Sequence, residues 1–331
     1  MPTIAVLGAG SWGTALAVLL ARNGADVRLW GHLAEDVERL QADRENRQFL
    51  PGVPLPPRVR PEADLELALA GVADVLVVVP SHAFRSVLEA VAPRLARGVP
   101  VAWATKGFEP QTGRLLHEVA ATVLPGRNLA VLSGPSFAGE VAHGLPTAIT
   151  IAATQPAYGE RLAAYLHGEA FRAYTSTDLV GVQVGGAAKN VMAIAAGIAD
   201  GLGFGANSRA ALITRGLAEI TRLGLALGGR PETFMGLAGL GDLALTCTDD
   251  QSRNRRMGLA LARGLSIDAA RAEIGQEVEG VATAREVWHK SRALGVEMPI
   301  TEQTYKVLYE GLAPLAAVQA LLGRRQRAEL D

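Results

Sequence analysis

The sequence predicts an α/β protein built from two domains, a doubly wound parallel β-sheet over residues 1–178 and an all-α domain over residues 179–331. Its 331 residues are about twice the usual length of one domain. In the first half, short apolar runs alternate with helical stretches. After about Ser176 the pattern changes to long helical stretches rich in Ala, Leu and Gly, with no convincing strand.

Six short apolar runs predict the strands of the first domain. The helical stretches between them, beginning with residues 11–23, are long enough for crossover connections, so the strands should run parallel and be buried on both faces. A proline-rich stretch at 51–61 should be a surface loop inserted between two such units. The expected strands cover residues 3–7, 27–30, 75–79, 99–104, 129–132 and 148–151.

The second domain is predicted from helical patterns alone. A charged segment at 323–331 should form a solvated tail after the last helix. The expected helices include residues 184–199, 208–227, 252–263 and 282–294.

Composition excludes several classes of protein. A net charge of −1 gives no global reason to bind nucleic acid or an anionic membrane. The single cysteine, Cys247, cannot form an intramolecular disulfide, and no His/Cys cluster has zinc spacing, so we expect a reducing compartment and no metal. No basic leader and no run of about 18 apolar residues is visible. We therefore expect a soluble cytoplasmic protein.

A glycine motif, GAGSWG, lies between the first strand and the first helix. Gly8 suits a tight turn, Gly10 lets backbone approach a pyrophosphate, and Gly13 lets helix and strand pack closely. Together with the N–H groups of the helix N-terminus, this pattern predicts a Rossmann-type dinucleotide-binding domain.

The end of the second strand bears on which dinucleotide binds. An Asp or Glu there would bind the ribose 2′-hydroxyl of NAD, but no carboxylate occurs before Glu35. His32 is either a hydrogen-bond donor to a 2′-phosphate or an ordinary loop histidine. We therefore expect NADP(H) to be tolerated as well as NAD(H).

Three further strand ends carry polar residues where ligands bind in open α/β sheets. Pro80 and Ser81 should line the cofactor crevice, while Lys106, Gly134 and Ser136 should lie near substrate. Tight turns alone would also explain Gly134 and Ser136, but they explain Lys106 less well.

Lys189 is a candidate for proton transfer. The chain has 28 arginines and only four lysines, so a lysine suggests a need for an amine that can lose its proton. Gly185 and Gly186 precede it in a helical pattern, at a cost of about 1 kcal/mol each, which suggests that the backbone approaches something closely, such as a ligand bridging the domains. Apolar neighbours should lower the pKa of Lys189. A lysine whose amine reaches the surface is the alternative.

Arginines gather near an expected helix start. Thr248 and Gln251 have capping-box spacing, which places residues 252–254 in the first turn. Arginine there is favourable only beside a bound anion, so Arg253 should hold a phosphate with Asn254, while Arg255 and Arg256 should form a solvated face. A later loop carries Glu277 and Glu279, whose spacing alone means little.

The motifs together resemble one family along nearly the whole chain, the bacterial NAD(P)-dependent sn-glycerol-3-phosphate dehydrogenases. The matching runs are GAGSWGTALA, VVVPSH, WATKG, SGPSFA, GGAAKN, GFGANSRAALITRG, GLAGLGDL and CTDDQSRNRR.

The resemblance implies reduction of dihydroxyacetone phosphate, with Lys189 as the proton donor, Asp242 orienting it and Lys106 stabilising negative charge. It also implies a site in the cleft between the domains. This sequence departs from the family pattern at two positions. Many relatives have Arg at the position of Leu33, and the position of Glu277 is often apolar. The implied cofactor contacts, with the glycine motif, are Gly8, Gly10, Ser11, Trp12, Gly13, His32, Lys106, Ala138, Arg253, Glu277 and Glu279. The implied substrate contacts are Lys106, Gly134, Ser136, Lys189, Asp242, Ser252, Arg253 and Asn254.

Two other functions remain open on the residues alone. A β-hydroxyacid dehydrogenase of the 6-phosphogluconate type shares the two-domain plan and an active lysine, but it needs a site for a carboxylate. A dinucleotide-binding sensor without turnover would have no use for the two lysines. The oligomeric state is also open, with a homodimer as one answer.

Overall fold

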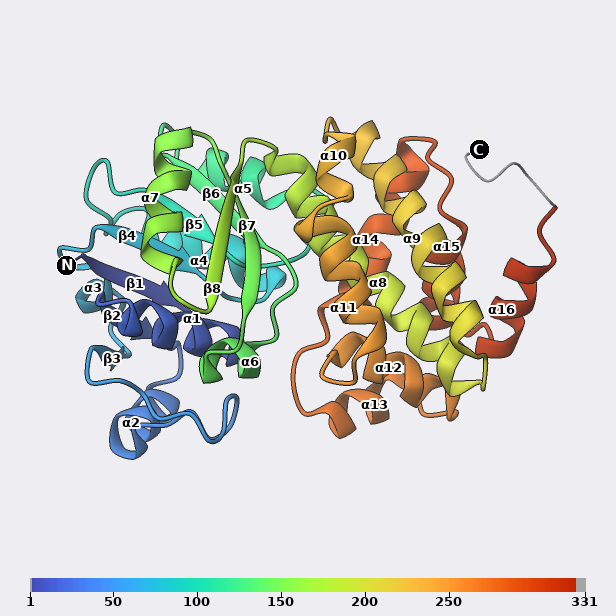
Figure 1. Ribbon diagram of the computed structural model, residues 1–331, viewed down its shortest axis with the longest axis horizontal. Coiled ribbons are helices and arrows are strands. Elements are labelled where there is room, and N and C mark those ends of the chain that lie inside the picture. The colour runs from blue at the N-terminus through green and yellow to red at the C-terminus, as the bar shows by residue number, and fades with distance from the viewer. Residues whose placement is uncertain (1, 326–331) are drawn as a thin grey trace.

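The computed structural model describes residues 2–325. An eight-stranded sheet flanked by helices occupies the first half of the chain, and helices alone occupy the second (Figure 1). The strand order is β3-β2-β1-β4-β5-β6-β7-β8, and only the β6–β7 pair is antiparallel. The strands are β1 (Thr3–Leu7), β2 (Asp26–Trp30), β3 (Val59–Glu62), β4 (Asp74–Val77), β5 (Val101–Trp103), β6 (Leu129–Ser133), β7 (Thr147–Ala153) and β8 (Phe171–Ser176).

The six predicted strands are all present, but three features of the sheet were not predicted. The prediction that the strands run parallel is wrong for the β6–β7 pair, because a uniformly apolar run does not indicate the direction of a strand. The predicted loop at 51–61 contains the start of β3, an edge strand that tolerates Pro61. β8 is also an edge strand, and only Phe171 in it is buried, so its sequence lacks an apolar run.

Helices cover both faces of the sheet, which explains why the strands are apolar throughout. In β1, Ile4 and Val6 join one core cluster while Ala5 and Leu7 join the other. The first cluster includes residues of α1 and α7, the second residues of α4 and α5. The helices here are α1 (Ser11–Arg22), α2 (Ala34–Asp43), α3 (Leu65–Leu69), α4 (Ser81–Val91), α5 (Leu116–Val123), α6 (Ala138–His143) and α7 (Pro156–Leu166).

One long helix, α8 (Leu179–Gly201), forms the centre of the second half, and α9, α11, α12 and α14 pack around it (Figure 1). It is long and apolar enough to cross a membrane, but 89% of its most apolar window is buried inside the protein, so it is a core helix. Around it lie α9 (Ala206–Ala226), α10 (Pro231–Phe234), the π-helical turn η1 (Leu237–Gly241), α11 (Asp242–Thr248), α12 (Arg253–Ala262), α13 (Ile267–Ile274), α14 (Glu279–Ala293), α15 (Pro299–Tyr309) and α16 (Pro314–Leu322).

Two predictions about helix ends need comment. The capping box at Thr248 and Gln251 is wrong: Thr248 is the last residue of α11, and its hydroxyl donates to the carbonyl of Ala244 at 2.8 Å. Ser252 caps α12 instead, and its Oγ accepts from the Arg255 N–H at 3.2 Å. Of the predicted tail at 323–331, residues 323–325 are exposed and residues 326–331 lie outside the described residues.

We propose that the two domains divide between Asp178 and Leu179. Strand β8 ends at Ser176 and α8 begins at Leu179. Asp178 caps α8, because its Oδ1 accepts from the N–H of Gly181 at 2.8 Å.

Backbone-to-backbone packing fixes α12 against α8. A Cβ added at Gly197 of α8 would lie 2.1 Å from the carbonyl oxygen of Arg255, and one added at Gly258 of α12 would lie 2.1 Å from that of Ile194. Neither helix can therefore carry a side chain where they cross, and the start of α12 is held close to the middle of α8.

Replacing Gly258 with Ala should force the two helices apart, because a carbonyl oxygen cannot rotate out of the way. We expect the free energy of unfolding to fall by about 2–3 kcal/mol, measured by urea denaturation. Gly139 in α6 has no atom within 4 Å of an added Cβ, so Gly139→Ala is the matched control and should be neutral or stabilising by up to about 1 kcal/mol. Equal effects of the two substitutions would contradict this account.

Candidate active site

The glycine motif forms the turn that its spacing predicts. Gly8 has a φ of +119°, and an added Cβ would lie 2.4 Å from the Val78 carbonyl oxygen. A Cβ on Gly13 would lie 1.8 Å from the Gly8 oxygen, so α1 packs directly on the turn. At Gly10 an added Cβ meets nothing within 4 Å, and no side chain caps α1. The turn therefore leaves backbone N–H groups free for a pyrophosphate.

The other residues predicted to contact the cofactor follow strand ends or begin helices near this turn. Trp12 and Ala138 lie in the first turns of α1 and α6, two helices that pack together, and both side chains pack against the same core cluster. His32 follows β2 and is exposed, as is Leu33. An exposed imidazole beside an apolar residue leaves this end of the site open to either dinucleotide.

A loop from the helical half reaches across to the sheet. The Ser11 hydroxyl donates to Gln276 Oε1 at 3.4 Å. The carboxylate of Glu279 accepts from the Ser81 N–H at 3.2 Å and from the Ser81 hydroxyl at 2.9 Å. Burial raises the pKa of Glu279 to about 7, although the Ser81 hydrogen bonds oppose the shift. Sequence spacing could not predict this contact of Glu279, because its partner Ser81 lies 198 residues away along the chain. Glu277 is exposed.

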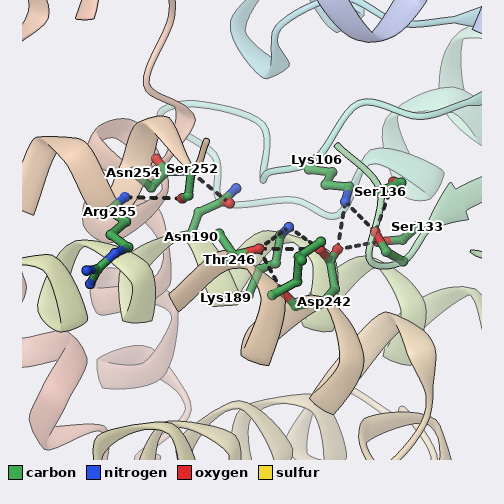
Figure 2. Close-up of polar contacts among 12 residues, drawn as sticks. Lys106, Ser133, Ser136, Lys189, Asn190, Asp242, Thr246, Ser252, Asn254 and Arg255 are labelled. Carbon is green, nitrogen blue, oxygen red and sulfur yellow. Dashed lines mark hydrogen bonds and ion pairs between the residues drawn. The ribbon is translucent and has the colours of Figure 1, made fainter. Parts of the chain in front are cut away.

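One buried carboxylate joins the two candidate lysines (Figure 2). Lys106 Nζ donates to Asp242 Oδ2 at 2.6 Å, and Lys189 Nζ donates to Asp242 Oδ1. Lys189 also donates to the hydroxyl of Thr246 at 2.8 Å. Lys189 is only 6% exposed, so its amine does not reach the surface and the alternative interpretation is wrong. Thr246, which sequence analysis missed, follows Asp242 by one helical turn on α11.

The electrostatics of this cluster favour a lysine that titrates near neutrality. Burial lowers the pKa of Lys189 to about 7, with Lys106 adding to the shift and Asp242 opposing it. Burial alone would raise the pKa of Asp242, but the two ammonium groups outweigh burial and hold it below its usual value. Because one carboxylate cannot balance two ammonium groups, the cluster carries a net positive charge.

The close approach expected at the glycines before Lys189 is confirmed, and protein atoms make it. A Cβ on Gly185 would lie 2.4 Å from the carbonyl oxygen of Ala238 in η1. One on Gly186 would lie 2.4 Å from the hydroxyl of Ser133 at the end of β6. The first contact brings the π-helical turn, and with it Asp242, against α8. The second brings the sheet against the same helix.

Gly134 and Ser136 lie beside Lys106, as the strand-end argument predicts. Gly134 has a φ of +152°, and an added Cβ would lie 2.9 Å from the Ile149 Cα. Its carbonyl oxygen accepts from Lys106 Nζ at 3.4 Å and from the Ser136 hydroxyl at 3.1 Å. Backbone geometry is therefore sufficient to explain this glycine.

The start of α12 combines structural residues with two arginines, Arg253 and Arg256, whose side chains form no hydrogen bond or ion pair within the described residues. Asn254 donates to Asn190 Oδ1 at 2.9 Å and accepts from the Gly280 N–H at 2.8 Å, so its side chain ties α12 to α8 and α14. Arg255 is buried and pairs with Asp200 and Asp250, so the predicted solvated face is wrong for it. Arg253, by contrast, is half-buried and forms no hydrogen bond or ion pair within residues 2–325. It is free to bind an anion.

Among the described residues, no three His, Cys, Asp or Glu side chains are placed to hold a metal ion. The site instead combines a dinucleotide-binding turn, a buried lysine of lowered pKa and an unpaired arginine. These features, on a Rossmann-type sheet followed by a helical domain, define a nicotinamide-dependent dehydrogenase.

Comparison with known proteins gives the family. Models described as the N-terminus and the C-terminus of NAD-dependent glycerol-3-phosphate dehydrogenase match residues 3–159 and 178–319. The chain therefore belongs to the NAD-dependent glycerol-3-phosphate dehydrogenase family. This membership sets aside the 6-phosphogluconate-type dehydrogenase and the sensor without turnover.

Relatives match end to end. The glycerol-3-phosphate dehydrogenase [NAD(P)+] of Pseudoalteromonas translucida is 59% identical over 98% of both chains, and that of Thioalkalivibrio sulfidiphilus is 58% identical over 99% of both. The crystal structure of glycerol-3-phosphate dehydrogenase from Coxiella burnetii is 49% identical, with a TM-score of 0.96 over 98% of this chain and 99% of that one. The enzyme from Saccharomyces cerevisiae is 26% identical, with a TM-score of 0.83 over 96% and 99%.

Replacing Asp242 with Asn should leave the buried ammonium group of Lys189 and the partly buried one of Lys106 without a counter-charge. We expect the free energy of unfolding at neutral pH to fall by about 3–5 kcal/mol, measured by urea denaturation. Asp268→Asn is the control, because that side chain is 94% exposed and should change stability by less than about 0.5 kcal/mol. A loss for Asp242→Asn no larger than the control's would refute the charge-sharing arrangement.

Proposed function

We propose that this chain catalyses the reversible NAD(P)H-dependent reduction of dihydroxyacetone phosphate to sn-glycerol 3-phosphate, a precursor of glycerophospholipids. The observation that carries the proposal is the Lys106–Asp242–Lys189 cluster, which lies between the dinucleotide-binding edge and the start of α12. The names of relatives that match over 98% of the chain support the substrate.

The cofactor, NAD(H) or NADP(H), supplies the hydride when it is bound. The open side of Gly10, the uncapped N-terminus of α1 and the exposed position of His32 all suit a dinucleotide. Arg253 and Glu279 face each other closely enough for their charges to interact, and Glu279 contacts Ser81 of the sheet. The residues that would hold the cofactor are Gly8, Gly10, Ser11, Trp12, Gly13, His32, Lys106, Ala138, Arg253, Glu277 and Glu279.

The substrate phosphate would bind at the N-terminus of α12. The Arg253 side chain forms no hydrogen bond or ion pair with the described residues, and the N-terminus of α12 favours an anion. Ser252 and Asn254 shape this turn from within, since both side chains already bind backbone or Asn190. The carbonyl end of the substrate would then lie near Lys106, Gly134, Ser136, Lys189 and Asp242.

Lys189 would donate the proton to the oxygen of the substrate carbonyl. Asp242 and Thr246 hold its Nζ in place, and a pKa of about 7 lets the amine both give and take a proton near neutral pH. Lys106 would offset the negative charge that develops on the substrate. A positioned general acid contributes about 10²–10⁴ in rate.

Lys189→Ala should therefore lower kcat for dihydroxyacetone phosphate reduction by about 10²–10⁴-fold and leave the Kd for NADPH nearly unchanged. In the wild type, reduction should slow as pH rises above about 7, because Lys189 loses the proton it must donate, while oxidation of glycerol 3-phosphate should speed up. The loss of reduced-nicotinamide absorbance measures the reduction, and its gain measures the oxidation of glycerol 3-phosphate. Lys306→Ala, which alters a surface lysine on α15, is the control. Wild-type turnover in Lys189→Ala would refute the assignment.

We also propose that the chain works in the cytoplasm and as a homodimer. The lone buried cysteine supports a reducing compartment. Helix α16 supports self-association, because it is almost wholly apolar and yet only Ala317 in it is buried, with Leu315 48% and Leu322 72% exposed.

Sedimentation equilibrium tests the oligomeric state. We expect the dimer mass for the wild type and the monomer mass for a variant carrying Leu315→Glu and Leu322→Glu, because buried carboxylates would destabilise an apolar interface. A monomeric wild type, or a variant that stays dimeric, would contradict an interface on α16.

A further inference from the structure

The segment from Gly107 to Leu115, here called the strap, joins β5 of the sheet to α5 and directly follows Lys106. By chain order it belongs to the first domain. Glu109 of the strap pairs with Arg85 of α4 in that domain. The buried apolar side chains of the strap, however, pack into the helical half of the molecule, and this placement bears on how Lys106 is held.

Two apolar side chains of the strap are part of the core of the helical half. Phe108 is 1% exposed and Leu115 is 3% exposed. The other buried members of their cluster all lie between Val184 and Ile300, in the second half of the chain. An antiparallel bridge pairs Phe108 with Leu115, so the two ends of the strap enter this core together.

Polar contacts fasten the strap to two helices of the same half. The N–H of Gln111 donates to Glu286 Oε1 of α14 at 3.3 Å. Just beyond the strap, the N–H of His117 donates to Gln183 Oε1 of α8 at 3.0 Å, and the Gln183 amide contacts His117 Nδ1 at 2.9 Å. The strap is thus anchored at its ends by apolar packing and at its tip by a hydrogen bond.

Only a short stretch of chain separates these anchors from Lys106. Phe108 follows Lys106 by two residues, so its Cα is no more than about 7 Å away along the chain. Gly107 between them has a φ of +147°, and an added Cβ would lie 2.9 Å from that of Ser81, so this link is tightly packed as well. On the other side, the Thr105 hydroxyl donates to the Val79 carbonyl at 2.7 Å.

We propose that Phe108 is a positioning residue for Lys106: by inserting into the core of the helical half, it holds the Lys106 amine on Asp242 and in register with Lys189. Lys106 therefore keeps its place relative to Lys189 when the cofactor-binding turn and the helical half shift against each other. The proposal rests on the proposed function, because its kinetic consequence is a loss of dihydroxyacetone phosphate reduction.

Loosening Lys106 has a second consequence, on the proton donor. The charged and titratable groups that face Lys189 are Lys106 and Asp242, with the Cys247 thiol nearby and neutral because burial raises its pKa to about 12. Lys106 lowers the pKa of Lys189. If Lys106 moves away, Asp242 acts on Lys189 alone and the pKa of Lys189 rises. The fall in the reduction rate at high pH then moves to higher pH.

The test compares kcat, KM and pH profiles of the full-length wild type with those of Phe108→Ala. We expect kcat to fall about 10²-fold, since misplacing a reacting group by about 1 Å costs that much, with the Kd for NADPH unchanged and the alkaline limb shifted upward. Phe108→Leu keeps an apolar anchor and should recover most of the rate. The matched control is Phe171→Ala, a phenylalanine 3% exposed in the core beneath α1 and α7, which should lose stability and leave kcat and the pH profile intact.

Glu286→Met is a second variant in case Phe108→Ala fails to fold. It removes the acceptor of the Gln111 N–H and fills similar space, and should lower kcat and move the alkaline limb in the same direction. An active wild type whose kcat and pH profile survive these changes, or a Phe171→Ala control that loses as much kcat, overturns the positioning role alone. A wild type that binds NADPH but does not reduce dihydroxyacetone phosphate overturns the proposed function first, and the positioning role with it.

Discussion

The structure depends on one carboxylate shared by two lysines. Asp242 accepts from Lys106 through one oxygen and from Lys189 through the other; Asp242 and Lys189 are buried, and the Lys106 side chain is 18% exposed. A buried charge without a partner would be costly, so none of the three can leave without destabilising the others. The three residues come from the end of β5, the middle of α8 and the start of α11. Holding these three elements in register is the constraint that the rest of the fold satisfies.

The fold meets that constraint with contacts between backbones. Gly185 lets the backbone of the π-helical turn before Asp242 rest on α8, while Gly186 makes room on the same helix for a side chain, the hydroxyl of Ser133 at the end of β6. Gly197 and Gly258 bring the backbone of α12 comparably close, about three turns further along α8. Contacts between backbones cannot adjust by changing a rotamer, so they position the ends of helices more firmly than side-chain packing does. The Asn190–Asn254 hydrogen bond, which has a preferred geometry, also joins α8 to α12.

Local patterns predicted the parts of this arrangement that are local in origin. The glycine turn, the core strands and the candidate lysine follow from short stretches of sequence, and the structure places the turn and the strands as expected. Partners distant in sequence could not be predicted in this way. The contact of Glu279 with Ser81 and the structural roles of Gly185 and Arg255 depend on residues that lie far away along the chain. The antiparallel direction of β7 was missed because an apolar run does not indicate strand direction. The resemblance to a family named the candidate site residues, and the contacts in the folded protein explain how they are held.

The net charge of the chain is another property that does not predict a local site. A net charge of −1 over the whole chain gives no sign of an anion site, because composition averages over the surface. In the structure, the Lys106–Asp242–Lys189 cluster carries an excess positive charge and Arg253 stands without a partner near the start of α12. Both lie where burial reduces screening by water, so their effect on a phosphorylated substrate is larger than that of the many paired arginines on the surface. The affinity of such a site for an anion is therefore set by which cations lack a carboxylate, and only the pairing of side chains in three dimensions shows which these are.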